Sequence, residues 1–430
     1  MSGTESPPDE ETSGTAESDH ERRNIYTLVS HQVLFRTAWI FKTESVIMPA
    51  FLDSISGSGW VRGMLPPLNR FGQSLAPLIL SERLANAPVK TRWLARCTTL
   101  MSLPFLCLGG LLFVDSVPST PLVIFFLASY LLFFCVNGVA QASFNTIQGK
   151  LIAPEKRGSL MALAGYVGSP VAVLMALLLL RPWTESDPPL FAAIFLFTGS
   201  MFFLAGFVVR RLHEDPDPAG PKSALRLKKR LREAGRFLRQ DRHLRRLCGL
   251  AALFVCAQLL FPHYQRLGRH QAGFHNHMLL YWVIAQNLSA ALFSWLSGRL
   301  ADARGTRSAL RWLILCAAFA PGVALVLAEY TDANWFWLAY FLLGAVPVSF
   351  RMFLNYALEL TERQNHPIYV STVVLCMAPP ILLSPFVGML VAEIGYLEPF
   401  LIISVVVVLA WVMTLMIIEP RHDLESHQND

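Results

Sequence analysis

The sequence predicts an all-α membrane protein with twelve transmembrane helices in two pseudo-symmetric six-helix bundles. Composition, the placement of positive charge and an internal repeat each favour this fold. Hydrophobic residues make up 53% of the 430 residues and charged residues only 15%, and the mean hydropathy is +0.43. A soluble domain carries about 25% charged residues, so the composition is typical of a chain that lies largely in lipid.

Apolar stretches long enough to cross a bilayer, at about 20 residues each, recur between charged, Pro or Gly residues. The predicted spans are 31–53, 60–80, 93–114, 120–147, 159–180, 189–209, 245–264, 276–297, 309–328, 334–358, 367–393 and 397–418. With span edges that are uncertain by several residues, about 28 of the 36 Lys and Arg residues lie on or at the edge of segments on one side, about four lie on the other and four lie deeper within spans. Lys and Arg concentrate in cytoplasmic loops. We therefore expect a multi-pass protein of the cell (inner) membrane with both termini in the cytoplasm.

The segments outside the bundles differ in composition. Residues 1–23 are rich in Ser, Thr, Pro, Asp and Glu and contain no apolar run, so we expect a disordered acidic cytoplasmic tail. The N-terminal bundle then spans residues 24–211, the C-terminal bundle spans residues 244–420, and a second cytoplasmic tail follows at 421–430.

The linker of residues 212–243 is strongly basic. It places Leu227, Leu231, Ala234 and Leu238 on one face of a helix and the Lys and Arg residues on the other. Such a helix lies on an anionic membrane surface. Because the basic residues gather beside a predicted span, we expect this surface to meet the lipid bilayer and not nucleic acid.

An internal repeat relates the two halves. The second predicted span ends in Leu80-Ser-Glu-Arg-Leu-Ala-Asn-Ala87, and the eighth ends in Leu296-Ser-Gly-Arg-Leu-Ala-Asp-Ala303. Six of the eight positions are identical, and the two copies lie 216 residues apart. Parallel six-helix repeats build a large class of transporters whose substrate site lies between the halves.

The second copy continues as Gly298-Arg-Leu-Ala-Asp302-Ala-Arg304-Gly305-Thr-Arg307, which resembles the signature loop of the major facilitator superfamily. The segment Ala153-Pro-Glu-Lys-Arg157-Gly158 is similar to that family's connection between helices 4 and 5. The resemblance covers about residues 25–420. It implies a secondary active transporter that works by alternating access, moves a small molecule, needs no cofactor and is a monomer.

The resemblance also implies a gate at the cytoplasmic side. The residues assigned to it are Gly298, Arg299, Asp302, Arg304, Gly305, Arg307, Arg157 and Arg363. Gly298 would let two helices approach, and Asp302 would lie near the start of the ninth helix, where the helix dipole favours an anion. Arg363 is the candidate basic partner. The first copy has Glu82 and Asn86 in place of the glycine and the aspartate, so the gate of the N-terminal half is expected to be weaker or built differently.

The same family builds its cavity from helices 1, 4, 7 and 10. Polar residues at i, i+4 and i+8 form one-face stripes in two of these helices, and polar residues facing lipid are costly. Hydrogen bonding between helices is the alternative role. The first stripe is Asn137, Gln141 and Asn145, and the second is Arg351, Asn355 and Glu359. The other expected cavity residues are Arg36, Lys42, Glu44, Arg70, Gln258 and His263.

The charged residues within the spans indicate what kind of substrate the protein carries. Glu44 and Arg70 fall at nearly the same depth, so an ion pair between them is expected, either structural or proton-sensitive. Glu44 and Glu359 are the candidates for proton coupling. The cations outnumber the carboxylates, which favours an anionic or amphipathic substrate.

Other functions remain open at this point. A multidrug or metabolite exporter of the same superfamily and a non-transporting receptor or scaffold are the alternatives. No H-E-x-x-H or G-x-S-x-G motif is present, so we expect no enzyme and no catalytic residue. His263, His270, His275 and His277 lie close together and could suit zinc, copper or nickel, but no Cys, Asp or Glu joins them locally, and no metal site is expected.

Overall fold

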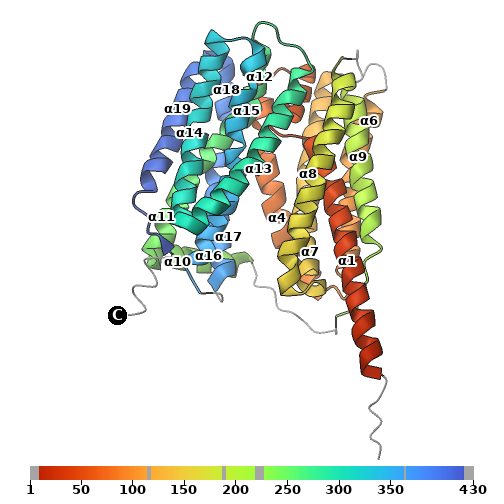
Figure 1. Ribbon diagram of the computed structural model, residues 1–430. Coiled ribbons are helices and arrows are strands. Elements are labelled where there is room, and N and C mark those ends of the chain that lie inside the picture. Colours follow the sequence, from red (N-terminus) through yellow and green to blue (C-terminus); the bar gives the residue numbers. More distant parts are fainter. Residues whose placement is uncertain (1–8, 114–117, 186–189, 218–226, 363–364, 421–430) are drawn as a thin grey trace, which may run out of the picture.

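The computed structural model describes residues 9–113, 118–185, 190–217, 227–362 and 365–420. Within these ranges the chain is helical, without strands. It forms two bundles side by side, one from each half of the sequence (Figure 1). The two-bundle, all-helical architecture is therefore confirmed.

The first bundle contains the helices up to residue 209. They are α1 (Asp9–Ile40), α2 (Ile47–Ile55), α3 (Gly59–Gly63), α4 (Leu65–Asn86), α5 (Thr91–Leu100), α6 (Ser102–Leu111), α7 (Ser119–Leu151), α8 (Pro154–Glu185) and α9 (Leu190–Val209). The linker contributes α10 (Leu227–Gln240).

The second bundle follows the linker. Its helices are α11 (Arg242–Phe254), η1 (Val255–Leu260), α12 (Phe261–Arg269), α13 (Met278–Arg304), α14 (Thr306–Tyr330), η2 (Ala333–Trp335), α15 (Trp337–Leu343), α16 (Ala345–Glu359), α17 (His366–Ile381), α18 (Ser384–Ile394) and α19 (Leu397–Met413).

Nine helical segments of the described chain are long and apolar enough to cross a membrane. They coincide with the third to eleventh predicted spans. The twelfth corresponds to α19, which is apolar but has only 17 residues. The first two fall on α1–α2 and α3–α4, which are broken or rich in polar residues. The chain is thus a multi-pass membrane protein, while these three spans and the cytoplasmic position of the termini stay predictions.

Proline accounts for the break in the first span. Pro49 lacks the N–H that would bond the carbonyl of Ser45, four residues earlier, and α1 and α2 are separated there by residues 41–46. The freed Ser45 carbonyl accepts a hydrogen bond from the Tyr340 hydroxyl at 3.1 Å. Pro262 has the same relation to Gln258 in the seventh span, where η1 replaces regular α-helix. Both breaks lie where the two bundles face each other.

The first helix is longer than the composition predicts. It begins at Asp9, so residues 9–23 of the expected disordered tail are helical, and residues 1–8 lie outside the described part. An existing helix extends without a new nucleation step. Glu21 also anchors this extension, because its carboxylate accepts hydrogen bonds from Lys156 at 2.5 Å and from the Ala153 N–H at 2.8 Å.

The predicted linker helix is present as α10, but its apolar face meets protein. Ala234 is buried, and the ring of Phe237 packs edge-on against Tyr369 of α17 at 5.6 Å. Arg232, Arg236 and Arg239 remain exposed. Contact between this basic surface and the bilayer stays a prediction.

Helices α4 and α7 pack closely because glycine removes the side chain between them. A Cβ at Gly72 would lie 2.6 Å from Phe134 Cβ and 2.8 Å from the backbone nitrogen of Cys135. At Gly149, near the end of α7, a Cβ would meet nothing within 4 Å. The close approach of α4 and α7 therefore requires glycine at position 72, whereas the packing does not require it at position 149.

We predict that Gly72→Ala lowers the free energy of unfolding by about 1–3 kcal/mol, the usual cost of overpacking. The matched Gly149→Ala should change it by less than about 0.5 kcal/mol. The thermal unfolding midpoint of the purified protein measures both. Equal midpoints for the two variants would contradict this account of the α4–α7 contact.

Candidate functional site

The two bundles are closed against each other at one end, here called the closed end, by α2, α3, α12 and α18. The backbones of Gly59 and Gly388 touch: a Cβ on Gly59 would lie 2.0 Å from the Gly388 carbonyl oxygen. Arg266 of α12 donates a hydrogen bond to the carbonyl of Gly57 in the other bundle, and Arg62 forms an ion pair with Asp53.

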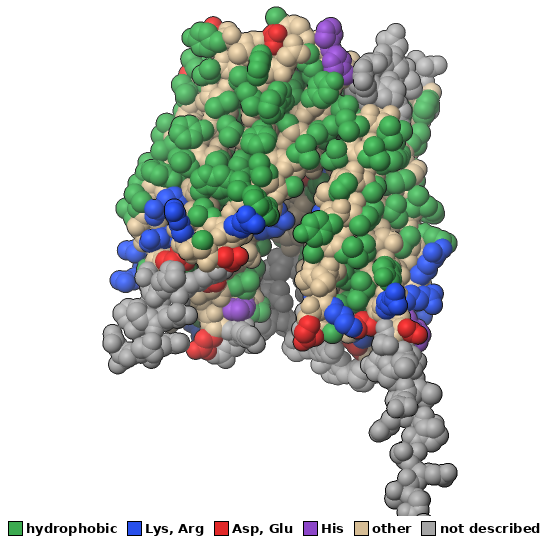
Figure 2. Space-filling model, viewed as in Figure 1, with side chains coloured by type: hydrophobic (Ala, Val, Ile, Leu, Met, Phe, Trp, Pro, Cys, Tyr) green, Lys and Arg blue, Asp and Glu red, His purple; other side chains and the backbone are tan. Residues whose placement is uncertain are grey.

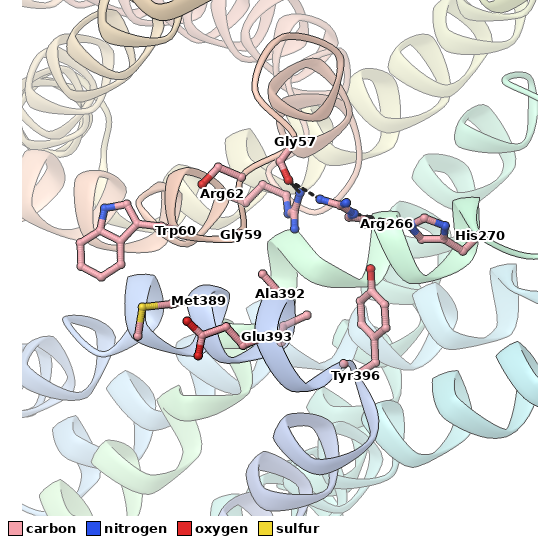
Figure 3. A pocket seen from close by; sticks show the side chains of 13 residues that line it. Gly57, Gly59, Trp60, Arg62, Arg266, His270, Met389, Ala392, Glu393 and Tyr396 are labelled. Carbon is pink, nitrogen blue, oxygen red and sulfur yellow. Dashed lines mark hydrogen bonds between the residues drawn. The ribbon is translucent and has the colours of Figure 1, made fainter.

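A pocket of about 440 Å³ lies over this closure. Figure 3 shows Arg266 reaching toward Gly57, with Tyr396, Ala392 and Glu393 on the opposite wall. His263, expected in the substrate cavity, instead lies at the closed end. It is fully buried and stands against Gly388, where a Cβ would lie 3.1 Å from its Cε1. The change from η1 to α12 just before it turns this side chain away from the cavity.

Between the bundles is a central cavity of about 960 Å³. Its wall includes Gln32, Phe35, Arg36, Trp39, Gln73, Asn137, Gln141, Asn145, Ser169, Asn287, Leu288 and Arg351. A second space of about 530 Å³ extends it toward the closed end and shares Arg36, Trp39, Gln73, Asn287 and Arg351 with it. Figure 2 shows the hollow widening away from the closed end, toward the end where α10 lies. The cavity is therefore accessible from the end where α10 lies.

Three arginines face this space, and their hydrogen-bonding partners are neutral. Arg36 of α1 donates to Ser169 Oγ at 3.3 Å, and Arg351 of α16 donates to Ser294 Oγ at 2.7 Å. Arg70 of α4 donates to Gln258 Oε1 at 3.0 Å and lies 4.1 Å from the centre of the Phe350 ring.

No ion pair of these three arginines is found within the described residues. The positive charges of Arg36 and Arg351 are therefore left for another partner, while Arg70 also interacts electrostatically with Glu44.

Glu44 and Lys42 form a separate, balanced pair. The Lys42 Nζ lies 3.0 Å from Glu44 Oε1 and 3.5 Å from the centre of the Trp39 ring. Asn69 donates to the other Glu44 oxygen, and Gln73 donates to Asn69 at 2.7 Å. The expected Glu44–Arg70 pair is thus replaced by Glu44–Lys42, because the irregular segment 41–46 turns Glu44 toward the neighbouring lysine.

The first polar stripe lines the cavity as the spacing predicts. Asn137, Gln141 and Asn145 all border it, and Gln141 donates to Asn145 at 3.2 Å. Gln258 borders the inner space. Gln73 and Asn287 also line the cavity but were missed. Asn69 and Gln73 show the same i, i+4 spacing on α4, and this pattern could have revealed Gln73.

The second stripe leaves the cavity after its first residue. Arg351 lines it, whereas Asn355 is exposed and borders neither space. Glu359 lies at the far end of α16, where it accepts a hydrogen bond from Thr306 Oγ1 at 2.8 Å. Its expected role in the substrate cavity is therefore wrong for this conformation.

The signature loop is organised by a carboxylate from elsewhere in the chain. Glu419 accepts hydrogen bonds from the backbone N–H groups of Thr306 at 3.1 Å and Arg307 at 3.0 Å, at the start of α14. Gly305 has φ +87°, and a Cβ there would lie 2.1 Å from the Glu419 carboxyl carbon. The anion at this helix dipole is thus Glu419, while Asp302 lies in the last turn of α13.

The other gate residues have mostly local roles. A Cβ on Gly298 would meet nothing within 4 Å, so this glycine does not bring two helices together here. Arg157 donates to the carbonyls of Ile152 and Gly149 at the end of α7. The remaining positions are Arg299, stacked on Trp295 at 4.2 Å; Arg307, which donates to the Ile417 carbonyl at 2.9 Å; Arg304, in the last turn of α13; and Arg363, outside the described residues.

The N-terminal half uses the same capping device despite its divergent loop. Glu214 accepts hydrogen bonds from the N–H groups of Lys90 at 3.0 Å and Thr91 at 2.7 Å, at the start of α5. Lys150 donates to the same carboxylate at 2.9 Å. In each half, a glutamate that follows the sixth helix therefore closes the start of the third.

The two capping glutamates are expected to respond to pH in opposite directions. Burial raises the pKa of Glu214, but the hydrogen bonds from Thr91, Lys90 and Lys150 lower it below its ordinary value of 4.5 overall. For Glu419, burial raises the pKa above 4.5, with Glu359 nearby adding to the effect.

We predict that Glu214→Gln costs about 1 kcal/mol of unfolding free energy at pH 7, as loss of a helix cap does. A depressed pKa gives stability that is present above pH 4.5 and lost as pH falls through the folded-state value. The cost of Glu214→Gln should therefore shrink toward pH 4, while that of Glu419→Gln should grow. Thermal midpoints of parent and variants between pH 8 and pH 4 test this, and parallel profiles for the two variants would refute it.

No group of three or more His, Cys, Asp or Glu side chains that could hold a metal occurs in the part of the chain that the structure describes. The outer histidines make ring contacts instead: His275 stacks on His277 at 5.5 Å, and His270 lies beside Tyr396.

Comparison with known proteins agrees with this architecture. The family model of the Major Facilitator Superfamily matches residues 164–372, and no curated protein sequence matches the chain. A bacterial homologue of the human lysosomal transporter Spinster, inward-facing and unoccupied, is 15% identical with a TM-score of 0.66, covering 94% of this chain and 98% of its own.

Two further solved structures show the same fold. The nucleoside transporter NupG is 12% identical with a TM-score of 0.69, over 91% of this chain and 99% of its own. A D-xylose-proton symporter is 14% identical with a TM-score of 0.64, over 92% and 98%. The chain therefore resembles the major facilitator superfamily in sequence over residues 164–372, and it shares the fold of these transporters over most of its length.

Proposed function

We propose that this protein is a secondary transporter, which carries a small organic anion through the central cavity by alternating access. The observation that carries the proposal is the set of three arginines that face the cavity with neutral partners. A charge removed from water is costly unless a counter-charge accompanies it. A bound anion would supply that counter-charge.

Arginine suits this role because its planar guanidinium can donate two parallel hydrogen bonds to a carboxylate or phosphate. Arg36 belongs to the first bundle and Arg351 to the second. An anion held by both would connect the bundles and favour a state in which they close around it. A ligand shifts a conformational equilibrium only through such a difference in affinity between states.

Proton coupling is proposed at Glu44. It is the only carboxylate among the described residues that line the two connected spaces. Protonation would remove its negative charge and leave the Lys42 ammonium as a fourth cation beside the site. Binding of the anion and of the proton would then favour each other. The fold is compatible with this chemistry, because one similar structure is a proton symporter and another, a peptide transporter, was solved with sulfate.

Export of an amphipathic metabolite or drug is the second candidate. Phe35, Trp39 and Ile40 line the central cavity beside Arg36. A substrate that combines an anionic group with an apolar part would match both surfaces. The cavity fits a non-transporting scaffold less well, because such a protein has no need of a polar space between its halves.

We predict that Arg351→Gln weakens anion binding about 10- to 100-fold, the loss expected for hydrogen bonds to a charged group. Thermal-shift titration with mono- and dicarboxylates, organic phosphates and sulfonates would measure this. The matched control is Arg236→Gln, an exposed arginine of α10 that belongs to neither the cavity nor the gate. Unchanged affinity in Arg351→Gln would rule out the proposed site.

For coupling, we predict that Glu44→Gln abolishes uptake driven by a pH gradient in proteoliposomes. Exchange of labelled for unlabelled substrate should continue, because it needs no net proton movement. If Glu44→Gln retained gradient-driven accumulation at the parental level, Glu44 could not be the coupling group.

A further inference from the structure

A second hollow, here called the flank pocket, lies beside the central cavity on the outer surface of the second bundle. Helices α13 and α15 form it, with Met278, Tyr281, Trp282, Ala285, Leu288 and Trp337 among its lining residues. Its volume is about 480 Å³. Nearly all of its lining is apolar or aromatic, so it fits a hydrocarbon chain and not a polar ligand.

The flank pocket and the central cavity share one lining residue. Leu288 lines both spaces, and 53% of this residue is exposed. On the cavity side its neighbours are Asn287 and Ala291 of α13, across from Pro170 and Val173 of α8. These helices flank the hollow between the bundles in Figure 1, and the same view in Figure 2 shows that hollow opening sideways. The opening faces the region that a bilayer would occupy.

We infer that the transported anion is amphipathic, with its charged head on Arg36 and Arg351 and its apolar tail passing between α8 and α13 into the flank pocket. The inference rests on the proposed function, because the arginines fix the position of the head. It adds the class of substrate, a single-chain amphiphile with a carboxylate or phosphate head, and a lateral path through the membrane.

The dimensions and the energetics suit this arrangement. From Leu288 to Met278, α13 rises about 15 Å, which a tail of about ten to twelve carbons would span. The interior of the cavity is rich in Asn and Gln. A hydrocarbon chain placed there would displace the water that forms hydrogen bonds with these side chains, which is costly. A lateral path keeps the tail in apolar surroundings while only the head enters the polar space.

The pocket also has a rigid floor. Trp282 is buried and stacks on Tyr340 at 5.2 Å, and the same tyrosine donates to the Ser45 carbonyl across the bundles. A tail that lies on Trp282 would therefore be linked through Tyr340 to the hydrogen bond that joins the two bundles.

Fatty acids and alkyl phosphates of four to twelve carbons, titrated against the protein in nanodiscs, test the inference. Affinity relative to free monomer should rise about fourfold per methylene, from about 0.8 kcal/mol each. Ala285→Phe, at a residue that lines the flank pocket and not the central cavity, should remove this increase and leave the four-carbon anion bound as in the parent. The control Leu292→Phe, two turns away at an exposed position that lines neither space, should keep it. Retained binding of the short anion also shows that the variant is folded.

A second measurement locates the tail directly. Fatty acids brominated near the chain end should quench the fluorescence of Trp337, seen as a difference between the parent and Trp337→Phe, and Ala285→Phe should abolish that difference. A chain-length series unaffected by Ala285→Phe, or the absence of Trp337 quenching, would overturn the lateral site while Arg351-dependent binding of short anions upheld the proposed function. Absence of Arg351-dependent binding at every chain length would overturn both.

Discussion

Three guanidinium groups in the interior of a membrane protein constrain everything around them. Each must have hydrogen-bond acceptors, since an unsatisfied charge at this depth is costly. Ser169, Ser294 and Gln258 supply them, and each lies on a helix that borders the space between the bundles. Because the acceptors are neutral, they satisfy the hydrogen-bond donors of the arginines without cancelling their positive charge. The cavity therefore carries positive charge, and the proposed preference for an anion rests on this arrangement.

The sequence predicts the two-bundle fold and one wall of the site well. Composition, the placement of charge and the internal repeat are properties of whole helices. A wrong assignment at a single residue therefore has little effect on the predicted fold. The stripe Asn137, Gln141 and Asn145 lies on an unbroken helix, where a spacing of four residues fixes a common face. Arg351 also borders the cavity, but Asn355, one turn later on the same helix, does not.

The failures have equally specific causes. Glu359 lies eight residues beyond Arg351, about 12 Å along the helix axis, and that distance takes it out of the cavity. His263 follows a change of helix type, and Glu44 lies in an irregular segment, so regular periodicity fails for both. Glu214 and Glu419 cap helices more than a hundred residues away in sequence, and no local pattern predicts such contacts.

The closed end has an asymmetry with a consequence for how the protein tolerates change. Two of its contacts between bundles, from Arg266 to Gly57 and from Tyr340 to Ser45, join a side chain of the second bundle to a backbone carbonyl of the first. Every residue type has a carbonyl, so a substitution at Ser45 preserves the acceptor wherever the backbone is kept. Gly57 differs, because its φ of +64° is one that residues with a side chain rarely adopt. The donor side chains, Arg266 and Tyr340, can be replaced only by residues that also donate a hydrogen bond there. Genetic variation that weakens these two contacts should therefore concentrate at Arg266, Tyr340 and Gly57.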